Sequence, residues 1–190
     1  MKKVVVLGCP GAGKSVFAAK LRRRAGLPLI HLDNLWWRAD RTHVSRAEFD
    51  QALASVLHTE AWILDGDFSR TYEVRVRACD AVVFLDYDEA VCMAGIKERA
   101  GQTRPDIPWT EEAPDPLLIE AVRRYRAEKR PIILNLLEQY PEKEQYLFRS
   151  REQAEEWLET LPPGQNSPCF GSSAAKTSSP NGIDIKETLQ

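Results

Sequence analysis

The chain has 190 residues, a formal net charge of −2 at pH 7 and a pI near 6.0. This length suits one domain with a sizeable core, and the balanced charge excludes a general nucleic-acid-binding protein. Because no apolar stretch is long enough to cross a membrane and the N-terminus enters a predicted strand at once, we expect a cytoplasmic protein without a transmembrane helix or signal peptide.

The first predicted elements frame a glycine-rich loop. The apolar run from Val4 to Leu7 predicts a strand, and KSVFAAKLRRRAG predicts a helix that ends at Gly26. Between them, GCPGAGKS has the spacing GxxxxGK[ST] of a phosphate-binding loop, the Walker A motif. The residues of this loop are Gly8, Cys9, Pro10, Gly11, Ala12, Gly13, Lys14 and Ser15.

Each residue type in this loop suits a nucleotide. The glycines allow positive φ angles, so that consecutive amide groups can converge on phosphate oxygens. Lys14 adds a positive charge, and the Ser15 hydroxyl is placed to bind Mg²⁺ where a helix begins. Cys9 fits as a small filler of the loop. The loop therefore predicts a nucleotide phosphate site.

The next elements alternate between strands and helices. Segments 27–33 (LPLIHLD), 61–67 (AWILDGD) and 81–87 (AVVFLDY) predict strands. Ser45 and Glu48 form a capping box for a helix whose apolar face holds Phe49, Leu53, Val56 and Leu57. The alternation of Val74 and Val76 in YEVRVRACD fits a strand, but its position between two strands favours a connecting helix.

The second half continues the alternation after a long loop. DEAVCMAGIKERAG predicts a helix, and QTRPDIPWTEEAPDP, with four prolines, predicts a mobile loop. LLIEAVRRYRAEKR predicts a helix, which Pro131 kinks or restarts before IILNLLEQY. QYLFRS predicts a fifth strand, and Ser150 with Gln153 caps a last helix, REQAEEWLETL. The inward face of the helix LLIEAVRRYRAEKR is predicted to hold Leu117, Leu118, Ala121, Val122 and Tyr125.

This order of elements predicts an α/β fold. Strands separated by helices form a parallel sheet with helices on both faces, and the ligand binds at the carboxyl ends of the strands. We expect one domain over residues 1–162, with a lid at about 99–116. Residues 163–190 are rich in Ser, Pro, Gly and Asn, which predicts a disordered tail.

The phosphate loop does not by itself select a class of protein. Kinases, GTPase switches and ATP-driven motors all use it. The chain has no NKxD motif to read guanine, and it leaves little room for a motor domain. A small-molecule kinase fits best.

Four further segments carry a family resemblance. LDGDFSRT resembles the DGFPRT segment of adenylate kinases, with Asp65 and Arg70 at the matching positions. GCPGAGKS, HLDNLWW, WILDGDFSRTYEVRVRACDAVVFLD and KERAGQTRPD, with the helix around KRPIILNLLEQY, resemble the topology modulation proteins (FlaR-like), which are P-loop proteins related to adenylate and shikimate kinases. This resemblance covers about residues 1–160. Asp67 stands where that family is expected to have Asn.

The resemblance implies a three-layer P-loop NTPase fold that is adenylate-kinase-like, with a five-stranded parallel sheet and a lid insertion. It also implies ATP binding, but no particular reaction. Asp65 would hold Mg²⁺; its rival is Asp86, because VVFLD also describes a Walker B strand. Asp33, at a predicted strand end, either meets an acceptor hydroxyl or caps the following loop. We expect His31 to be structural.

The remaining candidates would bind the acceptor and the phosphates. Trp36 or Trp37 could stack on the acceptor, and Arg70, through its match to DGFPRT, would bind an acceptor phosphate or carboxylate. The resemblance implies that Arg99 and Arg104 close over the transferring phosphates. Arg123 is a lesser candidate, within a run that otherwise reads as solvated charge: Arg123, Arg124, Arg126 and Arg130.

Two functions remain open at this stage. The first is a kinase that transfers the γ-phosphoryl group of MgATP to a small acceptor, such as a nucleotide or nucleoside. The second is a regulatory ATP-binding protein, or slow ATPase, that acts on DNA topology or through a protein partner; the basic helix from Arg123 to Arg130 is the argument for it. We favour the kinase, as a monomer or weak dimer, and do not expect nucleic acid as a direct ligand.

Overall fold

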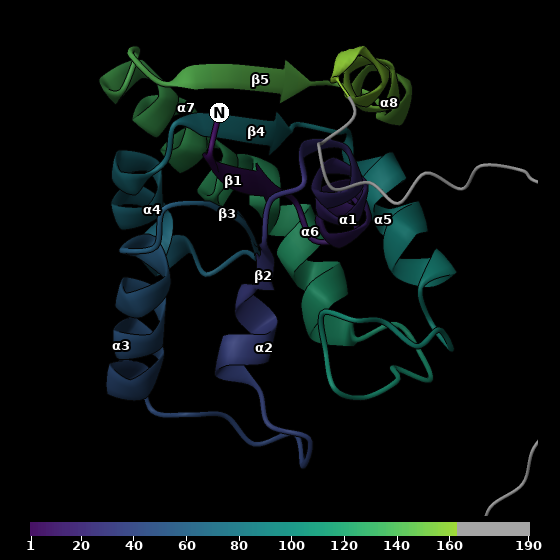
Figure 1. The fold of residues 1–190 in the computed structure, drawn as a ribbon. Helices are drawn as coiled ribbons and strands as arrows, with labels where there is room; N and C mark the ends of the chain where they lie inside the picture. The colour runs from purple at the N-terminus through teal and green to yellow at the C-terminus, as the bar shows by residue number, and fades with distance from the viewer. Residues whose placement is uncertain (163–190) are drawn as a thin grey trace, which may run out of the picture.

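A parallel sheet of five strands forms the centre of the molecule (Figure 1). The computed structural model describes residues 1–162, and the tail predicted for residues 163–190 lies outside them. The strands are β1 (Lys3–Gly8), β2 (Leu29–His31), β3 (Trp62–Asp65), β4 (Ala81–Leu85) and β5 (Glu144–Phe148). Their order in the sheet is β2-β3-β1-β4-β5, and all neighbouring strands are parallel. The predicted sheet is confirmed.

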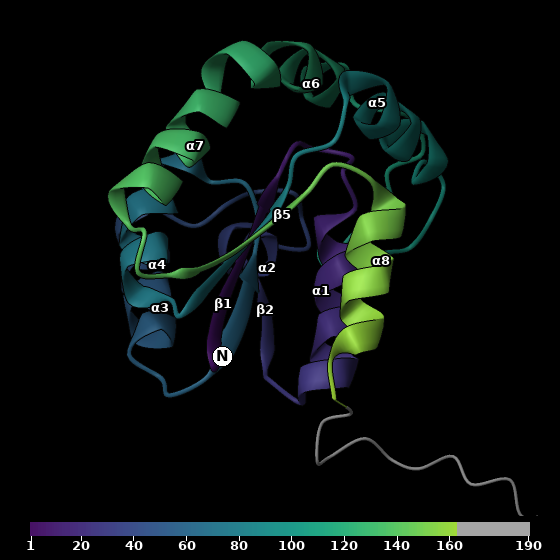
Figure 2. The same ribbon diagram turned by 90° about the horizontal axis from the view of Figure 1, so that it is seen from above.

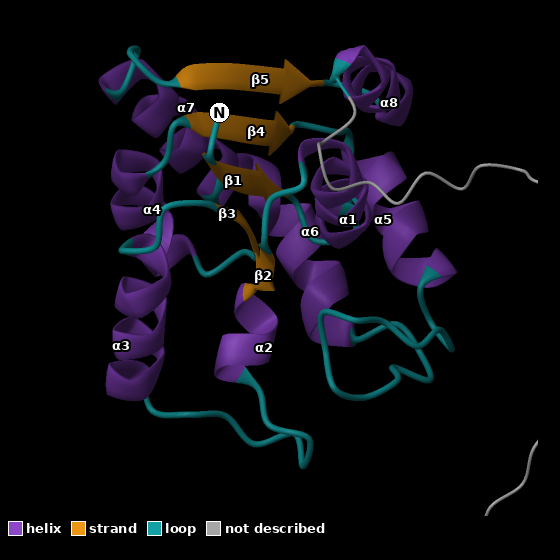
Figure 3. Cartoon of the chain, viewed as in Figure 1, coloured by secondary structure: helices purple, strands orange, loops and turns teal. Residues whose placement is uncertain are grey.

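Helices cover both faces of this sheet. Figure 2 shows α1 (Lys14–Ala25) and α8 (Arg151–Thr160) on one side, and α3 (Arg46–Leu57), α4 (Tyr72–Ala78) and α7 (Arg130–Gln139) on the other. Two further helices, α5 (Glu89–Glu98) and α6 (Pro116–Glu128), flank a long loop that Figure 3 shows without helix or strand. Short elements are α2 (Leu32–Trp36) and the 3-10 turn η1 (Ser69–Thr71). The three-layer α/β arrangement is therefore confirmed.

The middle strands are apolar because both faces of the sheet are covered. The side chains of β1 from Val4 to Val6, of β3 from Trp62 to Leu64 and of β4 from Ala81 to Leu85 are buried. Such continuous apolar runs are typical of parallel strands that are packed on both sides. The edge strand β5 is mostly exposed, and Phe148 at its end is its one buried residue. The core thus holds the carboxyl ends of β1 and β3 in fixed register next to each other.

The predicted strands 27–33, 61–67 and 81–87 are too long. β2 pairs with β3 only as far as His31 opposite Asp65, and the chain then begins α2 at Leu32. Asp33 therefore lies in the first turn of a short helix and does not end a strand. Beyond β3, Gly66 has a φ of +129°, and a Cβ atom there would stand 2.8 Å from the Leu32 Cβ atom. β2 and β3 therefore end together, because α2 begins after His31 and the chain turns at Gly66 after Asp65.

Most helix predictions are confirmed. The capping box of Ser45 and Glu48 is formed, the segment YEVRVRA is helical, and the Ser150 hydroxyl accepts a hydrogen bond from the Gln153 amide. Pro131 lies in the first turn of α7, which restarts after α6. The inward position of Leu117 is wrong, because its side chain is 79% exposed. Leu117 stands in the first turn of α6, one residue before the row of Leu118, Val122 and Tyr125 that packs on the core.

Helix length also bears on the predicted absence of a membrane span. Within residues 1–162, no helix combines the length and the apolar composition that a membrane crossing requires.

Candidate active site

The phosphate loop joins the carboxyl end of β1 to the N-terminus of α1. Gly11 and Gly13 have φ angles of +81° and +89°, which only glycine adopts readily. The Ala12 amide donates to the Cys9 carbonyl oxygen, which closes a tight turn. The Lys14 ammonium group donates to the carbonyl oxygens of Gly8, at 2.9 Å, and Cys9, at 3.1 Å. The loop therefore presents its amides and its lysine at one edge of the sheet.

Helix α5 packs against the phosphate loop backbone to backbone. A Cβ atom on Gly11 would lie 2.0 Å from the Cys92 carbonyl oxygen, and one on Gly95 would lie 2.0 Å from the Gly11 carbonyl oxygen. No side chain fits in either place without moving the backbone. The helix that leads into the lid is thus in direct contact with the phosphate loop.

Asp65 is the last residue of β3 and is 1% exposed. Its Oδ1 atom accepts a hydrogen bond from His31 Nδ1 at 3.0 Å across the β2–β3 pair. Its Oδ2 atom is buried and has no hydrogen-bond partner among the described residues. Burial lowers the pKa of His31, but the hydrogen bond and the charge of Asp65 outweigh it, so the pKa lies above its ordinary value. His31 therefore has the structural role expected of it, as a partner of Asp65.

Asp33 projects from the first turn of α2 and is half-buried. Burial raises its pKa to about 6, and the negative charges of Asp65 and Asp106 add to this effect, while Lys14 and Arg104 oppose it. A carboxylate with such a pKa exchanges a proton near neutral pH. Asp33 therefore lies within electrostatic reach of the phosphate loop and of the lid.

The segment between α5 and α6, residues 99–115, lies where we predicted a lid, and we keep that name for it. As predicted, it contains no helix or strand. The Arg99 and Arg104 guanidinium groups each approach Glu111 Oε2 at 3.2 Å. Burial lowers the pKa of Arg99, and the nearby Arg104 charge lowers it further. Asn34 of α2 donates to the Pro105 carbonyl oxygen at 2.9 Å. The lid thus holds two arginines together and touches the segment that carries Asp33.

Asp106, a lid residue that sequence reasoning did not select, contacts the phosphate loop. The Ser15 hydroxyl donates to Asp106 Oδ2 at 2.9 Å, and Arg104 approaches the same oxygen at 3.5 Å. Asp106 is 6% exposed, and its Oδ1 atom is buried without a hydrogen-bond partner among the described residues. Its place in the family-like segment KERAGQTRPD was the only signal in the sequence.

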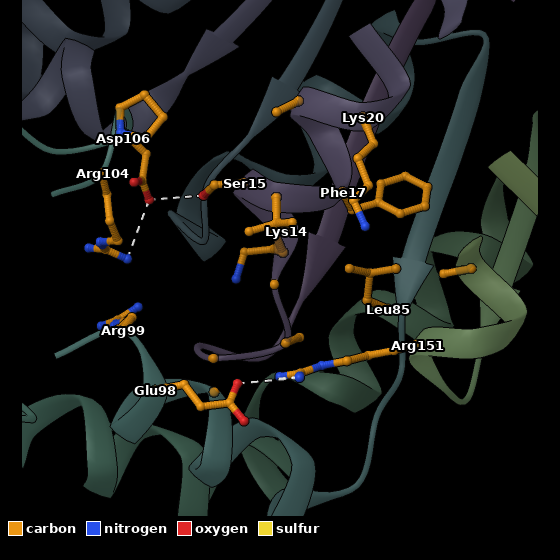
Figure 4. A pocket seen from close by; sticks show the side chains of 18 of the residues that line it. Lys14, Ser15, Phe17, Lys20, Leu85, Glu98, Arg99, Arg104, Asp106 and Arg151 are labelled. Carbon is orange, nitrogen blue, oxygen red and sulfur yellow. Dashed lines mark hydrogen bonds and ion pairs between the residues drawn. The ribbon is translucent and has the colours of Figure 1, made fainter. Parts of the chain in front are cut away.

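A cavity of about 640 Å³ opens between the phosphate loop, α1, the lid and α8. Figure 4 shows Lys14 pointing toward it from the start of α1 and Arg99 and Arg104 from the segment 99–115, with the contact between Ser15 and Asp106 at its border. This volume suits a small molecule. Asp33 and Asp65 do not line the cavity. The positively charged side chains of Lys14, Arg99 and Arg104 thus line the cavity, and these two carboxylates do not.

The two neighbouring tryptophans have different surroundings. The Trp36 ring stacks on His43 at 4.4 Å and meets the edges of Phe49 and Phe68, which places it in an aromatic cluster. Trp37 contacts the lid through Trp109, with ring centroids 5.5 Å apart. Trp36, the predicted acceptor residue, is therefore packed among other rings, whereas Trp37 joins the lid.

The structure does not bring Arg70 to this group of residues. Its side chain is 52% exposed and donates two hydrogen bonds to Asp50 of α3, at 3.1 Å and 2.5 Å. Asp67 accepts a hydrogen bond from the Tyr72 hydroxyl. Arg70 and Asp67 thus each have a partner of their own.

The arginine that supports this turn is Arg75, which sequence reasoning missed. It is 0% exposed and donates to the carbonyl oxygens of Gly66 at 3.1 Å and Asp67 at 2.8 Å. Burial lowers its pKa to about 10. The guanidinium group thus fixes the backbone that follows Asp65.

Asp86, the rival metal ligand, and the predicted solvated charge run are both engaged in ion pairs. Asp86 accepts two hydrogen bonds from Arg130, at 2.7 and 2.8 Å, so the solvated state expected for Arg130 is wrong. Arg123 is 63% exposed and approaches Glu120 at 3.8 Å, which places it away from the cavity. Arg124 and Arg126 pair with Glu128 and Asp88.

Comparisons with known proteins place this geometry in a fold. No protein-family model and no curated protein matches the chain. Among solved structures, a sugar kinase from Janibacter sp. HTCC2649 is similar at 18% identity and a TM-score of 0.52, over 84% of this chain and 91% of the kinase. Shikimate kinase from Acinetobacter baumannii in complex with shikimate is similar at 13% identity and a TM-score of 0.58, over 84% and 89% of the two chains. The described residues therefore have the α/β fold of P-loop kinases.

Proposed function

We propose that this protein is an ATP-dependent phosphotransferase that moves the γ-phosphoryl group of MgATP to a hydroxyl group of a small acceptor. The observation that carries the proposal is the arrangement of Lys14, Arg99 and Arg104 around one cavity, whose lining does not include Asp33 or Asp65. Phosphoryl transfer requires positive charge on the phosphates and a separate place for the acceptor. The likeness to P-loop kinases agrees with this division.

The residues fit a divalent cation that is shared with phosphates. Within residues 1–162, no three His, Cys, Asp or Glu side chains come together as a metal site of their own. Mg²⁺ in such folds is held by one or two protein groups together with phosphate oxygens. The Ser15 hydroxyl and the partnerless Oδ2 atom of Asp65 would supply those groups. Bound there, the cation would neutralise negative charge on the phosphates of the nucleotide.

The protein groups then divide the work of transfer. The amides of the phosphate loop and Lys14 bind the phosphates of ATP, and Arg99 and Arg104 stabilise the charge that develops on the γ-phosphoryl group. To do so, both arginines exchange Glu111 for phosphate oxygens. Asp33 accepts the proton of the acceptor hydroxyl, for which a pKa of about 6 is suited.

The class of acceptor follows from weaker observations. The resemblance to topology modulation proteins and to the adenylate-kinase segment DGFPRT favours a nucleotide or nucleoside, with Trp36 and Arg70 as its contacts. Arg70 would have to leave Asp50 for this role. Membership of that family, a cytoplasmic location and a monomeric or weakly dimeric state stay predictions.

A regulatory role on DNA is the second candidate. The basic helix α6 supports it less than its composition suggests, because Arg123, Arg124 and Arg126 each have an acidic partner. A protein that neutralises several phosphates with these residues would lose DNA affinity steeply as salt rises. Titration of duplex DNA at two salt concentrations tests this; binding without such a slope, or no binding, excludes a phosphate contact by α6.

The deciding experiment for the kinase is a screen for acceptors. ATP consumption is measured with nucleosides, nucleotides and small alcohols as additions, first with the wild type. We expect at least one class to stimulate consumption, and Asp33→Asn to lose the stimulation while it retains ATP binding. If no compound stimulates the wild type, or if Asp33→Asn responds as the wild type does, the acceptor site is assigned wrongly.

A further inference from the structure

The contact between Ser15 and Asp106 leaves the serine ready for a cation. A hydroxyl group has one hydrogen to donate and two lone pairs to share. The hydrogen of Ser15 is directed to Asp106 Oδ2 at 2.9 Å, so its lone pairs remain available on the other side of the oxygen. Figure 4 shows the Asp106 carboxylate directed at Ser15, at the border of the cavity that Lys14 faces.

The two other acids at this edge of the sheet have their own partners. Both carboxylate oxygens of Asp86 accept hydrogen bonds from Arg130. One oxygen of Asp65 is held by His31. Among the described residues, the carboxylate that meets the phosphate-loop serine therefore comes from the lid and not from either strand end.

Two buried carboxylate oxygens lack a partner here. Asp106 Oδ1 and Asp65 Oδ2 make no hydrogen bond among the described residues, although their side chains are 94% or more buried, being 6% and 1% exposed. An oxygen of an ionised carboxylate that is withdrawn from water without a partner is costly. A divalent cation that is shared with bound phosphates would give such an oxygen a partner.

We infer that Asp106 is a lid-borne carboxylate of the divalent-cation site at Ser15, which it helps to build either by direct ligation or through a bound water. This inference rests on the proposed function, because the cation arrives with the nucleotide. It adds to the sites at Ser15 and Asp65 a residue from a different segment of the chain.

The position of Asp106 couples the cation to closure of the lid. The lid is held against α2 by the Asn34 contact to Pro105 and by Trp37 against Trp109. Arg104, two residues before Asp106, approaches the same carboxylate at 3.5 Å. Closing the lid therefore delivers an arginine for the phosphates and a carboxylate for the cation in one movement, and opening it removes both.

The experiment compares nucleotide binding with and without metal. The dissociation constant of ATP is measured by calorimetry in excess Mg²⁺ and in excess EDTA, for the wild type and for Asp106→Asn. We expect Asp106→Asn to weaken binding of MgATP about 10- to 100-fold, as loss of a group beside a metal does. Binding of metal-free ATP should be unchanged or stronger, because a negative charge near the phosphates is removed.

A thiol in place of the carboxylate makes the test specific to the cation. Asp106→Cys should bind ATP poorly with Mg²⁺ and recover with Cd²⁺, because thiolates prefer soft cations. The matched control is Glu111→Cys in the same lid, since Glu111 contacts the arginines and not Ser15. Its ratio of Mg²⁺ to Cd²⁺ affinities should equal that of the wild type, in which Cys9 is equally present.

The outcomes separate this inference from the proposed function. A wild type that binds no ATP in Mg²⁺ overturns both. A wild type that binds MgATP, with an Asp106→Asn variant that binds it equally well, overturns the inference alone. The inference is also overturned if Asp106→Asn binds ATP more tightly than the wild type by the same factor in Mg²⁺ and in EDTA. Asp106 would then only repel the phosphates and have no part in binding the cation.

Discussion

Asp86 and Arg130 form a two-pronged ion pair, with Arg130 Nε 2.7 Å from Asp86 Oδ1 and a terminal nitrogen 2.8 Å from Oδ2. Asp86 follows β4 and Arg130 begins α7, so the pair ties the sheet to the helix layer. Asp86 is 9% exposed and cannot turn to water without moving the chain.

The first prediction follows from this pair. Arg130→Met keeps most of the packing but leaves the Asp86 carboxylate buried and unpaired, which we expect to lower the free energy of unfolding by about 3 kcal/mol. Urea denaturation measures the change. The matched control is Arg126→Met, whose partner Asp88 is exposed and whose loss should cost far less. Equal effects of the two variants would contradict a buried, structural role for the pair.

A second prediction concerns the phosphate loop. Lys14 contacts the carbonyl oxygens of its own loop and faces the cavity, so Lys14→Ala should leave the fold intact. It should remove most of the phosphate contribution to ATP affinity, because a charge at close range to the phosphates is lost. Calorimetric titration with MgATP, after circular dichroism has shown a folded variant, checks this. Unchanged affinity would show that the nucleotide binds elsewhere.

The lid arginines give a third prediction. If Arg99 and Arg104 act on the γ-phosphoryl group in the transition state, replacing either with Ala lowers kcat more than it weakens ATP binding. Glu111→Gln weakens the hold of Glu111 on both arginines, so it should lower the dissociation constant of MgATP. Steady-state kinetics and binding are compared for all three variants. Equal losses in kcat and affinity would make the arginines ordinary binding residues.

A fourth prediction concerns pH and Asp33. Its pKa of about 6 means that the proton-accepting form prevails only above that pH, so kcat/KM should rise as pH passes through 6 and then level off. The groups that act on it are Asp65, Lys14, Asp106 and Arg104. A kcat/KM that stays flat from about pH 5 to about pH 8 would exclude Asp33 as the base.

The raised pKa of Asp33 also makes the stability of the protein depend on pH. Between its ordinary value of 3.8 and about 6, Asp33 binds more protons in the folded than in the unfolded protein, so its contribution to stability falls as pH rises through this window. Asp33→Asn should therefore raise the melting temperature at neutral pH, with the gain shrinking as the pH approaches the lower value. A variant that is less stable than the wild type at neutral pH would show that the Asp33 carboxylate is compensated.

Arg70 gives the fifth prediction. If it binds an anionic acceptor, Asp50→Asn should strengthen acceptor binding, because Arg70 no longer has to leave its partner. Arg70→Ala should abolish the stimulation by such an acceptor and leave ATP affinity unchanged. The KM for the acceptor is the quantity to compare. An acceptor whose KM in both variants equals that of the wild type does not contact Arg70.

The helices and strands of this protein could be predicted because their signals are local. The capping box at Ser45 and Glu48 and the apolar runs around Val5 and Ile63 each lie within a few residues. The ends of β2 and β3 could not be predicted, because each strand stops where the other no longer offers a partner, at His31 and Asp65. Chain-local patterns do not contain that information.

Side-chain partners were harder still. Asp106 and Ser15 are 91 residues apart, and nothing near either of them announces the contact. Arg70 was assigned to the acceptor from a matching position, but Asp50, on a helix 20 residues earlier, takes its guanidinium group. Arg130 was placed in a solvated run because its neighbours are charged, whereas its partner lies 44 residues away. The partners of charged residues depend on contacts between distant parts of the chain, so local sequence does not predict them.

The close approach of Gly11 and Gly95 makes the phosphate loop and the root of the lid one mechanical unit. Their backbones touch without any side chain between them, so there is no soft layer to absorb a displacement. We therefore expect any shift of the loop on phosphate binding to be passed to α5, the helix that ends directly before Arg99. Even the smallest added side chain at this position, in Gly95→Ala, would therefore push α5 away from the phosphate loop.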